Sequence, residues 1–127
     1  MSRMTVLRLH VEVIPPEEGG RQGPVCDGYR GAISFGEKTD DGIPVVHDTV
    51  LVFESVEQVP PGGSAAARAW VVAPEGLPGG LGPGSTFSYV EGRRPVARAR
   101  LVEMCSDSTE FPAKDIEDAK TRRLDPA

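Results

Sequence analysis

The chain contains few of the residues that build metal sites and disulfide frameworks. Its two cysteines, Cys26 and Cys105, lie far apart and outside any C-x-x-C pair, which argues against a zinc knuckle or a disulfide framework. We interpret both as thiols in a reducing cytoplasm. His10 and His47 have no second histidine or cysteine at a ligand spacing, so we interpret them as solvated strand residues. We therefore expect no metal and no other cofactor.

Long apolar runs are missing as well. The N-terminal stretch MSRMTVLRLHVEV alternates polar and apolar residues from its start, unlike the continuous apolar region of a signal peptide. No later run has the length that crossing a bilayer requires. We expect a cytoplasmic protein with no membrane partner.

Positive charge is also scarce. The 14 lysines and arginines stand against 19 aspartates and glutamates, which gives a formal net charge of −5. Such a chain has no global attraction to phosphate polymers or anionic membranes. Any binding of RNA would therefore depend on a local basic patch.

Motifs for nucleotide binding and catalysis are incomplete. The stretch GGLGPGST at residues 79–86 nearly matches a phosphate loop, but Ser85 occupies the place of the lysine that reaches the phosphates. Glu17 and Glu18 precede a glycine pair, where they most simply solvate a turn. We expect neither nucleotide binding nor enzyme activity. An enzyme that uses Cys26 or Cys105 as a nucleophile stays open as the alternative with the least support.

The strongest positive signal is alternation of apolar and polar residues. Leu7, Leu9, Val11 and Val13 are interleaved with charged and polar residues, the pattern of a half-buried strand. Turn residues separate similar segments along this single-domain chain of 127 residues, which predicts about six strands in an antiparallel barrel or sandwich. The predicted strands are Leu7–Val13, Tyr29–Phe35, Val45–Phe53, Ala65–Val72, Thr86–Glu91 and Val96–Met104. We interpret Pro78–Gly84 as a long hairpin loop.

Two turns combine glycine with arginine, at Glu18–Arg21 and at Glu91–Arg94. Glycine allows a close approach of the backbone, and the arginine fork can hold a phosphate or a carboxylate with two bonds. The same residues also suit two exposed hairpins with solvating charges. The residues alone leave both interpretations open.

Three blocks in sequence order carry a resemblance to a known family. They are Val11–Ile14 with Glu17–Arg21 and Gly28–Arg30, then Val59–Gly63, and finally Phe87–Ala97. Together they resemble the C-terminal β-barrel, the third domain, of elongation factor Tu. The resemblance spans Leu7 to Met104 and implies an all-β fold, a six-stranded antiparallel β-barrel over residues 1–105. Residues 106–127 would then form a C-terminal tail, either a short helix or disordered.

The resemblance also implies a function. In that family the barrel helps to hold the T-stem of aminoacyl-tRNA and contacts translation proteins, and Arg21, Glu91 and Gly92 keep the family's residues. Gln22 and Ala32 depart from the family pattern, and the GTPase domain and second barrel are absent from this sequence. We expect a barrel that acts alone. We interpret the stretch EEGGRQGPVCDGYRGAISF as the first hairpin connection of this barrel. The candidate binding residues are Arg21, Gln22, Arg30, Glu91, Gly92, Arg93 and Arg94.

Two hypotheses for a noncatalytic function follow. The first is a binding module that docks on tRNA, another RNA stem or a translation protein. The alternative is a protein–protein interaction module, regulatory or of the immunity type, that keeps the barrel without tRNA binding. In both, Arg21 should lie beside the Glu91–Arg94 turn in an exposed patch, so that Arg21→Glu leaves the fold intact. Trp70 and Phe87 should face inward and be buried.

Overall fold

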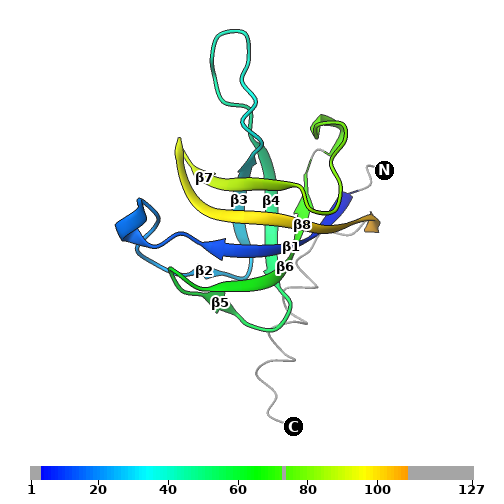
Figure 1. The fold of residues 1–127 in the computed structure, drawn as a ribbon. Coiled ribbons are helices and arrows are strands. Elements are labelled where there is room, and N and C mark those ends of the chain that lie inside the picture. The colour runs from blue at the N-terminus through cyan, green and yellow to red at the C-terminus, as the bar shows by residue number, and fades with distance from the viewer. Residues whose placement is uncertain (1–3, 73, 109–127) are drawn as a thin grey trace.

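The segments with alternating side chains form six strands that close into a barrel (Figure 1). The computed structural model describes residues 4–72 and 74–108. The barrel order is β1-β6-β4-β3-β7-β8, with every neighbouring pair antiparallel, which confirms the predicted fold class. These strands are β1 (Met4–Val13), β3 (Tyr29–Ser34), β4 (His47–Phe53), β6 (Ser64–Val71), β7 (Thr86–Glu91) and β8 (Arg94–Ser108).

Four short elements lie in the connections. The two-residue strands β2 (Val25–Cys26) and β5 (Gln58–Val59) pair with each other and escaped the sequence prediction, because two residues show no periodicity. Single 3-10 turns span Pro16–Glu18 and Pro74–Gly76. Strand β8 continues to Ser108, and the rest of the predicted tail lies outside the described residues. In the described ranges, no helix is both long and apolar enough to cross a membrane.

Inward side chains from every strand fill the barrel. Tyr89, Phe53, Leu51 and Ile33 are all fully buried there, and Phe87 joins the same cluster as predicted. Burial of such side chains is the main source of stability in a small barrel.

Trp70 differs from this prediction in one respect. It is only 2% exposed, which confirms that it is buried. Its neighbours Ala69 and Val71 belong to the interior cluster, however, so alternation along β6 places Trp70 on the outer side of the sheet. There it pairs in register with Val6 and Val50, and both of these are buried. The prediction of an inward-facing Trp70 is therefore wrong.

The connections cross the barrel more often than the sequence suggested. Residues 14–28 join β1 to β3, and residues 72–85 join β6 to β7, and neither pair of strands is adjacent. Both stretches were predicted as hairpin loops, and both predictions are wrong. Turn residues mark where a strand ends, but they do not specify which strand the chain pairs with next.

The β3–β4 connection is a true hairpin that projects beyond the barrel (Figure 1, top). We call residues 36–46 the ribbon. It is ordered by its own hydrogen bonds, because Val45 N donates to Glu37 O at 2.9 Å and Thr39 N donates to Ile43 O at 2.8 Å. Ile43, close to its tip, is 57% exposed. The ribbon therefore forms a defined wall above the outer face of β7 and β8.

Candidate binding surface

The fold brings together the two glycine-arginine turns that the sequence singled out. Arg21 follows β1 in the crossover, and Glu91 is the last residue of β7. The Arg21 Nη1 atom lies 2.8 Å from Glu91 Oε2. Gly20 makes this approach possible, because a Cβ at this position would lie 1.8 Å from the Ile14 carbonyl oxygen. The predicted juxtaposition of the turns is confirmed.

Tyr29 at the start of β3 completes this arrangement. Its hydroxyl donates to Glu91 Oε2 at 2.7 Å, and the Arg21 guanidinium carbon lies 5.3 Å from the centre of its ring. Burial, followed by the hydrogen bond to Glu91, raises the pKa of Tyr29 to about 12. The hydroxyl therefore keeps its proton and acts as a donor across the physiological range.

Arg94 adds a second cation to the same carboxylate. Its Nη2 atom lies 3.7 Å from Glu91 Oε1. We call Arg21, Tyr29, Glu91 and Arg94 the Glu91 cluster. Because two arginines share one carboxylate, the cluster holds a single net positive charge.

Arg21 is not the exposed turn residue that the sequence predicted. Its side chain is 25% exposed, and besides Glu91 it donates from Nε to the Gly23 carbonyl at 3.1 Å. A glutamate at this position would face Glu91 instead of pairing with it. The predicted exposure of Arg21 is therefore wrong, and the prediction that Arg21→Glu leaves the fold intact loses its basis.

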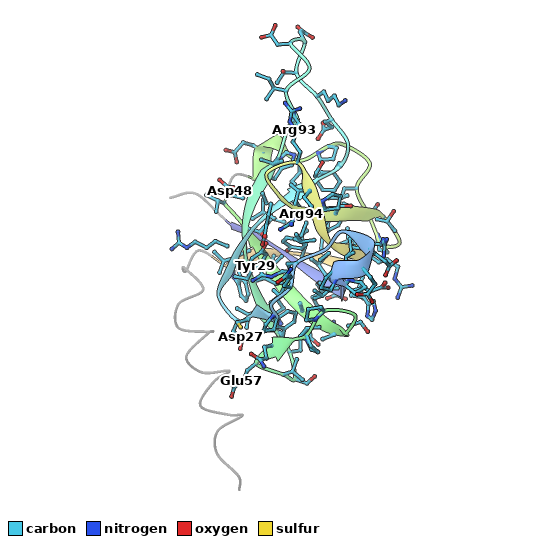
Figure 2. All side chains as sticks on the ribbon, turned by 90° about the vertical axis from the view of Figure 1, so that its left-hand side faces the viewer. Asp27, Tyr29, Asp48, Glu57, Arg93 and Arg94 are labelled. Carbon is cyan, nitrogen blue, oxygen red and sulfur yellow. The ribbon has the colours of Figure 1, made fainter. Side chains whose placement is uncertain are left out.

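The other predicted site residues separate into two groups. Gln22 is exposed beside Arg21, and Gly92 adopts a φ of 66° in the β7–β8 turn that exposes Arg93. In Figure 2, Arg93 and Arg94 lie above Tyr29, whereas the acidic residues Asp27 and Glu57 lie below it. Arg30 follows Tyr29 in β3 and is directed to the opposite face of the sheet. The structure does not bring it into the Glu91 cluster.

A groove with a volume of about 940 Å³ begins at the β7–β8 turn and extends beneath the ribbon. Its principal apolar residues are Phe35, Phe87, Val90 and Pro95. Its charged residues are Lys38, Arg93, Arg98, Arg100, Glu12 and Glu37. Gly92 and Arg93 line it too, so the turn links the Glu91 cluster to the groove.

The carboxylates of the groove already have partners, whereas most of its cations do not. Glu12 Oε1 lies 3.4 Å from Arg98 Nη1, and Glu37 Oε1 lies 3.4 Å from His47 Nε2. Within residues 4–72 and 74–108, no ion pair engages Lys38, Arg93 or Arg100. The charge available to a ligand in the groove is therefore positive.

Aromatic contacts hold the base of the groove. The Phe35 and Phe87 ring centres lie 5.0 Å apart, and Phe35 meets the His47 ring edge-on at 5.5 Å. His47 is buried in this position, so the prediction of a solvated histidine is wrong for it, although it holds for the exposed His10. These contacts fix the base of the ribbon relative to β7.

The groove was not predicted from the sequence. Arg98 and Arg100 alternate with buried Ala97, Ala99 and Leu101, and this alternation alone places both arginines on the outer face of β8. The outward direction of these two arginines could therefore have been predicted from the sequence. The position of the ribbon beside β8 could not be predicted, because it depends on how the barrel closes.

Two kinds of catalytic site can be compared with the described residues, a metal site and a cysteine nucleophile. No group of three histidine, cysteine, aspartate or glutamate side chains in this part of the chain could hold a metal ion. The exposed Cys26 Sγ lies 3.6 Å from Gln58 Oε1, an amide oxygen that cannot act as a strong base. No protein-family model matches the sequence.

Proposed function

We propose that this barrel is a noncatalytic module that binds another protein through the groove. One observation supports the proposal above the others, namely that an apolar base and cations with no ion pair in the described part of the chain share a single open groove. A surface of this kind buries apolar side chains of a partner, while the charged rim orients them.

Three features favour a protein partner over RNA. Arg21, the cation that the family resemblance assigns to a tRNA stem, is paired with Glu91. Glu12 and Glu37 also line the groove and leave it with less net positive charge than a surface for many phosphates needs. Affinity for RNA depends on the number of phosphates that a protein neutralises, and this surface offers few free cations.

The proposal is consistent with the resemblance to the third domain of elongation factor Tu. A barrel of that origin would keep its architecture while its tRNA contacts change, and a translation protein would remain a candidate partner. The exposed free thiol of Cys26 suits a reducing compartment, so we place the interaction in the cytoplasm.

Two matched variants test the proposal. Ser88 lines the groove, so Ser88→Trp should fill it, whereas Ser55→Trp adds the same side chain at an exposed loop position outside the groove. Wild type and both variants would serve as baits in a cell lysate, with and without ribonuclease. We expect a stoichiometric protein that survives ribonuclease and is lost only with Ser88→Trp. Recovery of RNA alone, or equal capture by all three baits, would overturn the proposal.

A further inference from the structure

We propose that the groove takes an extended peptide segment of about seven residues with a carboxylate near each end and apolar residues between them. This inference rests on the proposed function and identifies the chemistry of the partner. It follows from the order in which the barrel register places charged and apolar residues along the groove.

The register between β7 and β8 defines four levels. Arg93 stands at the turn, Val90 pairs with Pro95 at the next level, Ser88 with Arg98 after that, and Thr86 with Arg100 at the far end. Each of these residues lines the groove. Arg93 and Arg100, which have no ion pair among the described residues, thus mark its two ends, and the apolar pair lies between them.

Distance along a strand sets the length of the ligand. Arg100 follows Arg93 by seven residues, and the register shift between Tyr89 and Val90 takes up one of them, so six rises of ~3.3 Å place the two arginines roughly 20 Å apart. An extended peptide with the same rise covers that span with about seven residues. Carboxylates at the two ends of such a peptide would reach both arginines at once.

The middle of the groove favours apolar side chains. Val90 and Pro95 lie on one wall, and Phe35 contributes an aromatic ring from the side of the ribbon. Arg98 in this region is paired with Glu12, so it offers less to a third charge than the two end arginines do. A central carboxylate would also lie near Glu12.

Recognition would depend on side chains and not on strand addition. Both β7 and β8 have a paired neighbour on each side within the closed barrel, so neither presents a free edge to a peptide backbone. The ligand must then be distinguished by its charges and apolar groups, which makes their spacing the testable property.

The probe is a fluorescein-labelled seven-residue peptide with glutamate at each end and valine and phenylalanine between them. Its binding to the full chain would be measured by fluorescence anisotropy at low and at high salt. Controls are a peptide of the same composition with both glutamates at one end, a peptide with lysine at both ends, and a stem-loop RNA.

Arg93→Glu and Arg100→Glu should each weaken binding about tenfold, the equivalent of 1.4 kcal/mol. The matched control is Arg68→Glu, an exposed arginine on β6 that does not line the groove, and it should leave affinity unchanged. We also expect the end-spaced peptide to bind more tightly than the clustered one, with weaker binding at high salt.

Equal affinity for both glutamate peptides, or no binding of either, would overturn this inference. If Ser88→Trp still abolished protein capture, only the peptide chemistry would be wrong, and the proposed function would stand. Tighter binding of the stem-loop RNA, lost in Arg93→Glu and Arg100→Glu, would overturn both.

Discussion

The Glu91 cluster and the groove are neighbouring cationic regions that use their charge in opposite ways. In the cluster, Arg21 and Arg94 both approach one carboxylate, and the shortest N···O distance is 2.8 Å. In the groove, Arg93 at the β7–β8 turn and Arg100 on the outside of β8 have no ion pair in the described part of the chain. An arginine beside a glycine turn therefore indicates a binding site only when the fold leaves its charge unpaired.

The difference has a structural cause. Arg21 follows a crossover that folds back onto the barrel, where Gly20 packs against the Ile14 backbone and Tyr29 shields the guanidinium. Arg100 projects from a strand whose inner positions are filled by Ala97, Ala99 and Leu101. Neighbouring residues bind the Arg21 side chain, whereas the pleat of β8 directs Arg100 toward the outer face of the barrel.

The largest effect should come from the core beneath the Glu91 cluster. Tyr89 is fully buried and its ring centre lies 6.2 Å from that of Tyr29. Because a large cavity would form under Tyr29, Tyr89→Ala should lower the free energy of unfolding by about 3–5 kcal/mol. Urea denaturation measures this change. Tyr89→Phe loses only the hydrogen-bonding contact with Thr49 and should cost about 1 kcal/mol. Equal losses for both variants would show that the ring is not a packing element.

Removal of the Glu91 carboxylate should lower the stability of the protein more than removal of a carboxylate in the groove. Glu91→Ala leaves Arg21 and the Tyr29 hydroxyl without their acceptor. Glu91 is 36% exposed, so water partly replaces it as an acceptor in the variant. The free energy of unfolding should therefore fall by only about 1 kcal/mol, less than the usual cost of removing a charged hydrogen-bond partner. The matched variant Glu12→Ala breaks an exposed pair in the groove and should cost less than about 0.5 kcal/mol. A larger loss for Glu12→Ala in urea denaturation would reverse the comparison.

Alkaline pH should weaken the cluster through Tyr29. Its pKa rises from 10.0 to about 12 on folding, so the unfolded chain loses this proton first. The contribution to stability is complete below pH 10 and is lost as the pH rises through about 12. Tyr29→Phe should therefore lose less stability than wild type between these pH values in urea denaturation.

The variant should retain some dependence on pH, because burial also raises the pKa of Tyr89. Superimposable stability curves for wild type and Tyr29→Phe across this range would show that burial and Glu91 do not raise the pKa of Tyr29. The absorbance of tyrosinate measures the same titration independently. The variant should lack the ionisation step of Tyr29, which occurs at high pH in wild type.

The smallest effect on folding should come from the groove arginines. Arg93→Ala and Arg100→Ala alter exposed side chains without ion pairs in the described residues, so each should shift the free energy of unfolding by no more than about 0.5 kcal/mol. The same variants should reduce binding of the end-spaced peptide. Thermal denaturation and anisotropy, measured on one preparation, separate the two effects. A marked loss of stability would assign these arginines to the fold.

Local patterns predicted much of the barrel. The alternation at Leu7, Leu9, Val11 and Val13 identified β1, and similar patterns located the other five barrel strands within a few residues. The pairing of Arg21 with the Glu91 turn came from the family resemblance, since 70 residues separate the two positions. Chain crossovers were missed because turn residues define where strands end and not which strands become neighbours.

Local sequence patterns were sufficient for the all-β class and for the approximate bounds of the six barrel strands, because these properties follow from backbone geometry over a few residues. Tertiary structure alone decided which arginines remain available to a ligand. Closure of the barrel set Glu91 against Arg21 and placed the ribbon above Arg93 and Arg100. Electrostatic pairing depends on distance in space, and residues far apart in the chain acquire that distance only through the fold.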